Sequence, residues 1–278
     1  MDYARPELLA DTGWLAEHLA DPMVRIIDCG FLDAYNRAHI PGAVGLPVHH
    51  YIKEPDPAGG PFGVHVMPPA EFEALMGSLG VGGGTTVVVY DDDSARPATR
   101  LWWVLNYYGH SKVKVLNGGW HRWLTEGWPV TFHAAPVVPA TFQATPVPAI
   151  HASASNLSER LAAGSCQVLD ARSDGEWQGT EDRGNRRGGH VPGAHHLEWS
   201  RSIDPGDMRT FLPAADLERL VSDAGIVRGK ETVTYCQAGV RGAHAAFALA
   251  LLGFENVRVY DGSMREWANR DDTPLTLD

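Results

Sequence analysis

Cysteine is scarce in this sequence, and long apolar runs are missing. The three cysteines lack C-x-x-C spacing, which argues against a disulfide-stapled scaffold and against a cysteine-rich zinc site. No apolar stretch approaches the roughly 18 residues that a membrane span needs. The H-E-x-x-H, Walker A and G-x-G-x-x-G patterns are also missing, so the sequence indicates no metal and no nucleotide cofactor.

Positive charge is in deficit. The chain has 23 Lys and Arg against 34 Asp and Glu, a formal net charge of −11, so we expect no nucleic-acid partner and no membrane surface as partner. The polar N-terminus lacks the charged and apolar regions of a signal peptide. We therefore expect a cytoplasmic protein whose thiols stay reduced.

The sequence contains two copies of one pattern. An apolar run ending in Asp is followed by an H-x-P-G-A motif, then by an apolar run ending in Tyr, and last by a Gly with a Trp five residues later. The paired landmarks are Asp28 and Asp170, His39 and His190, Tyr90 and Tyr235, Gly118 and Gly262, and Trp123 and Trp267. Their conserved order indicates an internal duplication.

The duplicated pattern predicts an α/β fold. Short, near-continuous apolar runs alternate with helical patterns, as in βαβ units whose parallel sheet is covered by helices on both faces. A length of 278 residues suits about two domains at roughly 100–200 residues each. We expect an N-terminal domain over residues 1–132, a proline-rich extended linker over 133–150 and a C-terminal domain over 151–278.

The two copies differ at the junction that follows the Tyr-ending strand. The second copy has Cys236 there and the first has Asp91. A loop that runs into a helix N-terminus directs N–H groups inward and favours a thiolate. Gly239 permits a tight backbone path, and Arg241 adds a positive charge. A carboxylate cannot accept sulfur, so we expect the first copy to be catalytically inactive.

On these residues, the chain resembles the tandem-domain rhodanese family of thiosulfate and 3-mercaptopyruvate sulfurtransferases. The resemblance implies two tandem rhodanese-like domains and catalysis in the C-terminal one. It implies a persulfide on Cys236, formed from a small sulfur donor and discharged to cyanide, a thiol or a protein thiol such as thioredoxin. No cofactor is implied. The loop expected to stabilise the persulfide comprises Gln237, Ala238, Gly239, Val240 and Arg241.

The match to the family is incomplete at the positions that select the donor. Ala238 replaces a lysine that many thiosulfate enzymes carry, and Glu176 replaces an arginine of well-known two-domain members. An anionic donor needs positive charge, so we expect it to bind Arg172 and Arg241. We expect Arg186 and Arg187, from an insertion that begins at Arg183, to take part as well, and Asp170 to orient Arg172 or the loop.

Thiosulfate is the donor that the sequence favours, with 3-mercaptopyruvate as the alternative. Two other classes stay open at this point: a cysteine phosphatase-like enzyme, because of the C…R arrangement from Cys236 to Arg241, and a non-enzymatic persulfide carrier. A role for His65 at the domain cleft also stays open.

Overall fold

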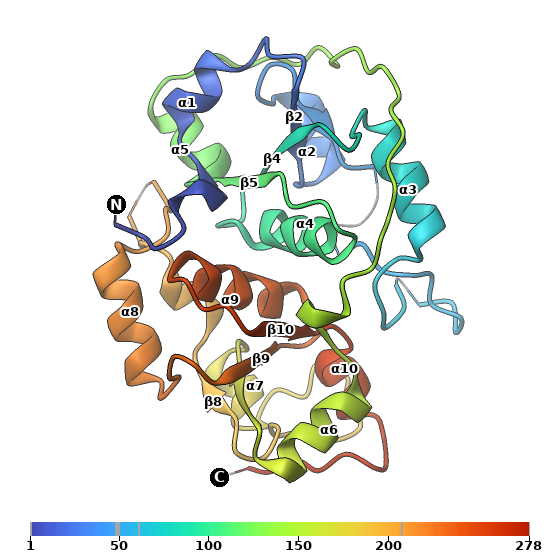
Figure 1. The fold of residues 1–278 in the computed structure, drawn as a ribbon, viewed down its shortest axis with the longest axis vertical. Helices are drawn as coiled ribbons and strands as arrows, with labels where there is room; N and C mark the ends of the chain where they lie inside the picture. The colour runs from blue at the N-terminus through green and yellow to red at the C-terminus, as the bar shows by residue number, and fades with distance from the viewer. Residues whose placement is uncertain (1, 48–50, 61, 207, 278) are drawn as a thin grey trace.

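Two α/β domains of the same topology follow one another along the chain (Figure 1). The computed structural model describes residues 2–47, 51–60, 62–206 and 208–277. Each domain has a five-stranded sheet, in the order β1-β5-β4-β2-β3 in the first and β6-β10-β9-β7-β8 in the second. All strand pairs in both sheets are parallel. The predicted fold class and the internal duplication are confirmed.

The elements of the first domain alternate as βαβ units predict. Its strands are β1 (Leu9–Ala10), β2 (Val24–Asp28), β3 (Val44–Gly45), β4 (Thr86–Tyr90) and β5 (Val113–Leu116). Its helices are α1 (Thr12–Glu17), α2 (Leu32–Arg37), α3 (Pro69–Ser78), α4 (Arg96–Tyr107) and α5 (Gly119–Thr125), after a 3₁₀ turn η1 (Pro6–Leu8).

The second domain repeats this order. Its strands are β6 (His151–Ala152), β7 (Cys166–Asp170), β8 (His195–His196), β9 (Glu231–Tyr235) and β10 (Val257–Tyr260). Its helices are α6 (Ala154–Ala163), α7 (Asp174–Trp177), α8 (Ala214–Asp223), α9 (Val240–Leu251) and α10 (Ser263–Trp267), with 3₁₀ turns η2 (Pro148–Ile150) and η3 (Trp199–Ser202).

The central strands are buried on both faces, which explains their continuous apolar sequence. In β4, Val87 and Val89 belong to the large core that faces the other domain. Val88 and Tyr90 belong to a separate core on the opposite face. Alternate residues of a strand point to opposite faces, so each face needs its own apolar cover.

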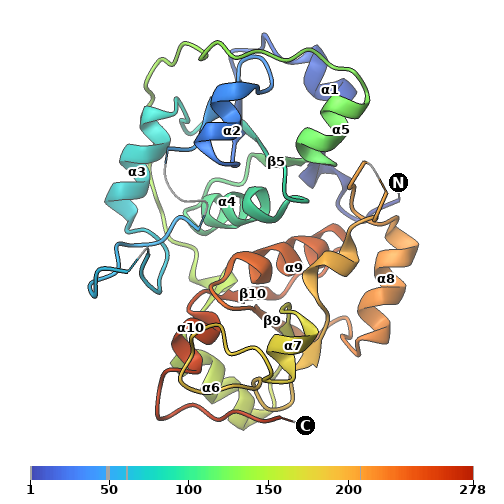
Figure 2. The same cartoon turned by 180° about the vertical axis from the view of Figure 1, so that it is seen from behind.

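Helices α4 and α9 pack against each other between the two sheets (Figures 1 and 2). Trp102 of α4 meets Phe247 of α9 edge to face, with ring centroids 4.9 Å apart. A single core cluster runs from one domain into the other through this contact. Because α4 and α9 each follow the equivalent loop of their own domain, this packing brings the two loops close to the same interface.

The segment between the domains is extended. Residues 134–147 contain no helix or strand, and they pack along the first domain. The N–H of Ala140 donates to Gly77, and the Phe142 ring lies edge to face with Phe72 at 5.6 Å. Among the described residues, every helix is too short or too polar to cross a lipid bilayer.

Candidate active site

Cys236 lies between the end of β9 and the start of α9, at the carboxyl edge of the second sheet. Ligands bind at this edge in open α/β sheets. The side chain is buried and borders a cleft of about 410 Å³. The cleft is lined by Tyr51, Phe62, Arg96, Ser173, Arg183, Glu198, Trp199 and Arg265, and by Cys236, Gln237, Ala238, Val240 and Arg241 of the loop. Both domains therefore contribute to it.

Hydrogen bonds to the first residues of α10 fix the backbone of the Cys236 loop. Ser263 Oγ accepts hydrogen bonds from the N–H groups of Cys236 and Gly239, each at 3.1 Å, and donates to the carbonyl of Tyr260 at 2.8 Å. The carbonyls of Cys236 and Gln237 accept from N–H groups of α10 at 3.0 and 2.9 Å. Ser263 lies between Gly262 and Trp267 of the duplicated pattern, but its role as an anchor was not predicted.

Gly239 is required by the path of the loop. Its φ of +79° lies in the left-handed region. A Cβ atom there would lie 2.6 Å from Oδ1 of Asp261. The tight backbone path expected at Gly239 is present, and its cause is the buried carboxylate behind it.

The inner side of the loop presents free backbone donors. Within the described residues, the N–H groups of Gln237, Ala238, Val240 and Arg241 donate to no protein acceptor. All four residues line the cleft beside Cys236. Free N–H groups at the start of a helix favour negative charge.

The equivalent loop of the first domain shows where such donors converge. Asp91 occupies the position of Cys236, and its carboxylate accepts the N–H groups of Asp93 at 2.8 Å, Ala95 at 3.0 Å and Ala98 at 2.7 Å. The N–H groups of Asp93 and Ala95 correspond to the free N–H groups of Ala238 and Val240 in the second domain. Burial raises the pKa of Asp91 to about 7, and the N–H donors act in the opposite direction. The N–H groups of this loop therefore surround an acceptor atom that lies two bonds beyond the Cβ of the side chain.

Arg241 forms a bidentate ion pair with Glu176. Nη1 and Nη2 of Arg241 donate to the two carboxylate oxygens at 2.6 and 2.8 Å. Glu176 is fully buried in α7, where it also accepts hydrogen bonds from Ser173. Burial alone would raise the pKa of Glu176, but Arg241 and Ser173 lower it to about 2. Arg241 borders the cleft, with its charge balanced by this carboxylate.

The structure places Arg172 outside the cleft lining. Its guanidinium is buried, with Nε 3.0 Å and Nη2 2.6 Å from the Asp170 carboxylate and Nη2 2.9 Å from the carbonyl of Gly189. Asp170 does orient Arg172, but it holds the side chain in the domain core. Sequence spacing could not reveal this, because Gly189 is brought to Arg172 only by the fold.

Arg186 and Arg187 also bind protein groups away from the cleft. Arg186 is paired with the exposed Asp271 at 2.5 Å, and Arg187 donates to backbone carbonyls of the C-terminal segment, including Thr273 at 2.8 Å. Neither lines the cleft. Arg172, Arg186 and Arg187 thus have protein partners and lie outside the lining of the cleft.

Besides Arg241, three further arginines from separate segments line the cleft. Arg96 opens α4 of the first domain, Arg183 belongs to the insertion, and Arg265 lies in α10. Arg96 and Arg265 were not predicted. Arg96 follows Asp91 at the same spacing at which Arg241 follows Cys236, and this correspondence is the signal that could have identified it.

Comparison with known proteins agrees with this geometry. The family model of the rhodanese-like domain matches residues 11–126 and 153–270. The chain belongs to the rhodanese family. The sulfur carrier protein TtuD of Thermus thermophilus is 34% identical over 99% of this chain and 98% of its own. A thiosulfate sulfurtransferase of Pseudomonas aeruginosa is 34% identical over 97% of each chain.

A solved structure extends the comparison. SseA of Escherichia coli, described as a 3-mercaptopyruvate sulfotransferase, superimposes with a TM-score of 0.82 at 27% identity, covering 92% of this chain and 98% of its own. The predicted family is thus confirmed, and this chain is a rhodanese-family sulfurtransferase.

In this rhodanese, a buried ionic cluster joins the two domains behind the loop. Oδ1 of Asp261 lies 2.6 Å from Nη1 of Arg100 and 2.9 Å from Nζ of Lys53, and none of the three side chains is exposed. Burial lowers the pKa of Lys53 to about 8, with Asp261 acting against that shift. Burial would raise the pKa of Asp261, but Arg100 and Lys53 lower it to about 2.

His65 does not reach the site of this rhodanese. It is exposed, its N–H donates to Glu54 at 3.1 Å, and it does not line the cleft. A different histidine, His244 of α9, lies buried at the domain interface with Nε2 3.2 Å from the carbonyl of Ser94. Burial lowers the pKa of His244 to about 3, so the imidazole is neutral at physiological pH.

Proposed function

We propose that this chain transfers sulfane sulfur from thiosulfate to cyanide or a thiol through a persulfide on Cys236. The observation that carries the proposal is the loop of free N–H donors around Cys236. Its counterpart in the first domain supports the assignment, because there the same backbone surrounds the carboxylate of Asp91. The outer sulfur of a persulfide lies two bonds beyond Cβ, as does a carboxylate oxygen of Asp91.

In the first half-reaction, the Cys236 thiolate attacks the sulfane sulfur of thiosulfate. A new S–S bond forms, the original S–S bond breaks, and sulfite leaves with the electron pair. The persulfide then carries the negative charge on its outer sulfur. The free N–H groups of the loop stabilise that charge in the manner of an oxyanion hole.

The donor and the departing sulfite are both anions. Arg96, Arg183 and Arg265 line the cleft, each in an ion pair with a neighbouring carboxylate but with a side chain that solvent still reaches. They supply the positive charge that these anions require. The thiosulfate sulfurtransferase of Pseudomonas aeruginosa, 34% identical, supports thiosulfate as the donor. The carboxylate of 3-mercaptopyruvate would meet the same arginines, so that donor is tested in parallel.

In the second half-reaction, cyanide or a thiolate attacks the outer sulfur and Cys236 leaves as the thiolate. The acceptor gains the sulfur atom and Cys236 returns to its starting state. Cys236 is a free thiol, as are Cys29 and Cys166, which fits the reduced, cytoplasmic setting that we propose. A protein thiol such as thioredoxin is a further proposed acceptor.

The first experiment is intact-mass measurement of the full chain before and after thiosulfate, and again after cyanide. We expect a gain of about 32 Da, one sulfur atom, that cyanide removes. Cys236→Ser should not gain it, whereas the matched control Cys166→Ser should. The same series with 3-mercaptopyruvate identifies the preferred donor.

Three other outcomes would overturn all or part of the proposal. If neither donor adds sulfur, the persulfide mechanism fails. If the chain instead hydrolyses a phosphate ester such as p-nitrophenyl phosphate, it is a phosphatase. If sulfur loads but neither cyanide nor small thiols remove it, the chain is a carrier, the role named for TtuD of Thermus thermophilus.

A further inference from the structure

The second domain contains a buried seat for a guanidinium group. The guanidinium of Arg172 is held there by the Asp170 carboxylate and by the carbonyl of Gly189, with Nη2 2.6 Å from the former and 2.9 Å from the latter. Its central carbon lies 5.6 Å from the ring centroid of Tyr235. A carboxylate, a carbonyl and an aromatic ring are the groups that recognise a planar cation.

The first domain keeps the same carboxylate and the same ring. Asp28 pairs with Tyr90 in the register in which Asp170 pairs with Tyr235. The N–H of Ile40 donates to the Tyr90 hydroxyl at 3.2 Å, and the equivalent N–H of the second domain makes the same bond at 3.2 Å. The aspartate and the tyrosine that surround the Arg172 guanidinium therefore have counterparts in the first domain.

The arginine itself is missing from the first domain. Gly30 stands where the second domain has Arg172, and its N–H donates to Asp28 at 2.8 Å, as that of Arg172 donates to Asp170 at 2.9 Å. Ala38, just before the H-x-P-G-A motif, stands in place of Gly189. The backbone differs at this second position, with φ of −166° at Ala38 and +104° at Gly189, and Gly30 has no side chain to fill the seat.

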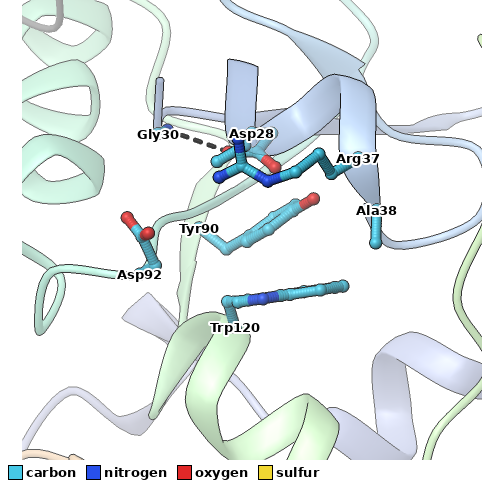
Figure 3. Close-up of a pocket in the computed structure, with 8 residues that line it drawn as sticks. Asp28, Gly30, Arg37, Ala38, Tyr90, Asp92 and Trp120 are labelled. Atoms are coloured by element: carbon cyan, nitrogen blue, oxygen red, sulfur yellow. Dashed lines mark hydrogen bonds between the residues drawn. The ribbon is translucent and has the colours of Figure 1, made fainter. Parts of the chain in front are cut away.

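A cavity of about 180 Å³ lies at this position (Figure 3). Its lining includes Asp28, Gly30, Ala38 and Tyr90, the counterparts of the residues that form the Arg172 seat. Trp120 adds a second aromatic wall, nearly parallel to Tyr90 with ring centroids 6.3 Å apart. A cavity of about 150 Å³ holds a molecule of the size of benzene, so a small planar cation fits.

The charges around the cavity favour a single positive charge. The carboxylates of Asp28 and Asp92 and the guanidinium of Arg37 line it. Figure 3 shows the Arg37 side chain directed toward Asp28 from α2, yet Arg37 is exposed and forms no ion pair with any described carboxylate. Asp28 therefore lacks the direct ion pair with a guanidinium group that Asp170 forms with Arg172.

We propose that this cavity of the first domain binds the guanidinium group of another molecule. The guanidinium would lie on Tyr90 and donate to Asp28, as that of Arg172 lies beside Tyr235 and donates to Asp170 in the second domain. The site is separate from the Cys236 cleft and shares no lining residue with it. The inference does not depend on the proposed sulfur transfer.

Isothermal titration of the full chain with methylguanidine tests this site. We expect saturable binding of one molecule per chain. Gly30→Arg supplies an internal guanidinium and should abolish binding, and Asp28→Asn should weaken it at least tenfold. Asp33→Asn is the matched control, because Asp33 lies on α2, is exposed and does not line the cavity.

Folding of the variants is checked by their thermal midpoints. Gly30 has no left-handed φ, and an arginine occupies the equivalent backbone position in the second domain. We therefore expect Gly30→Arg to melt at or above the temperature of the wild type. Methylammonium has the charge but not the planar shape of a guanidinium group, and methylurea has the planar shape but no charge. Both should bind at least tenfold more weakly than methylguanidine.

A second titration distinguishes the two sources of a guanidinium. Tighter binding of acetyl-Gly-Arg-Gly-amide than of methylguanidine would identify an arginine side chain of a protein as the ligand. Weaker binding of the peptide would identify a small guanidinium compound. The proposal is overturned if methylguanidine does not bind saturably, if Gly30→Arg still binds it, or if methylurea binds equally well.

Discussion

Arg100 of the first domain and Asp261 of the second are joined by a fully buried ion pair of 2.6 Å. Asp261 lies directly behind Gly239 of the Cys236 loop, and Lys53 contacts it from the first domain as well. The first domain has Asp91 in place of Cys236, but it supplies two of the three charges in this cluster. Its packing against the second domain thus supports the loop that contains Cys236.

Removal of Arg100 should destabilise the protein strongly. In Arg100→Met, Asp261 stays buried with only Lys53 to compensate it, and breaking a buried pair costs about 3–5 kcal/mol. The measurement is the free energy of unfolding in urea. Arg219→Met, which breaks the exposed pair with Asp216, is the control and should cost less than about 1 kcal/mol. Equal costs for the two variants would contradict this prediction.

Ser263→Gly should impair the loop without distorting the backbone. Ser263 has a left-handed φ of +51°, and Gly119 occupies the equivalent position of the first domain at +50°. Glycine suits this conformation but leaves two buried N–H groups without their acceptor, at about 1–3 kcal/mol each. We expect lower stability and a slower rate of persulfide formation, measured by intact mass over time.

Ser263→Ala separates the two effects of this position. It removes the hydroxyl and keeps the strain of a left-handed non-glycine residue. Ser263→Ala should therefore unfold at a lower urea concentration than Ser263→Gly. The reverse order would show that backbone strain at this residue is negligible.

Arg96→Gln should weaken the use of an anionic donor. Arg96 reaches the cleft from the first domain, so its loss reduces the positive charge at the entrance without touching the loop. We expect kcat/KM for thiosulfate to fall about 10-fold or more, mainly through KM, since one charged contact to the donor is lost. Steady-state kinetics with cyanide as acceptor measures this, and Arg219→Gln is the exposed control.

His244 should make the protein less stable as the pH falls below about 6.5. Its folded pKa of about 3 lies below the ordinary value of 6.5, so the unfolded chain binds the additional proton first. Stability that is present above pH 6.5 is then lost at about 1.4 kcal/mol per pH unit toward the folded pKa. Urea unfolding of the wild type and of His244→Gln at pH 7, 6 and 5 measures the difference. A constant difference across these values would contradict the prediction.

The repeated landmarks were sufficient to predict the α/β class, the duplication and the family. Strand periodicity and the order of motifs are local properties, and they are read directly along the chain. The contrast between Asp91 and Cys236 was also visible, because it required only that the two copies be aligned. The role of the Asp91 carboxylate as an acceptor for loop N–H groups was not visible, since it depends on how the backbone turns.

The assignment of the arginines shows what tertiary structure alone decided. Arg172 and Arg187 match or flank sequence motifs, but Asp170 and the carbonyls of the C-terminal segment already bind them. Arg96 lies 140 residues from Cys236 in the sequence, and it reaches the cleft because α4 packs on α9. A guanidinium binds whichever carboxylate or carbonyl the fold brings within about 3 Å, and sequence spacing does not encode that distance. The sequence by itself determined the fold, the duplication and the position of the cysteine, whereas the packing of the two domains decided which charges surround it.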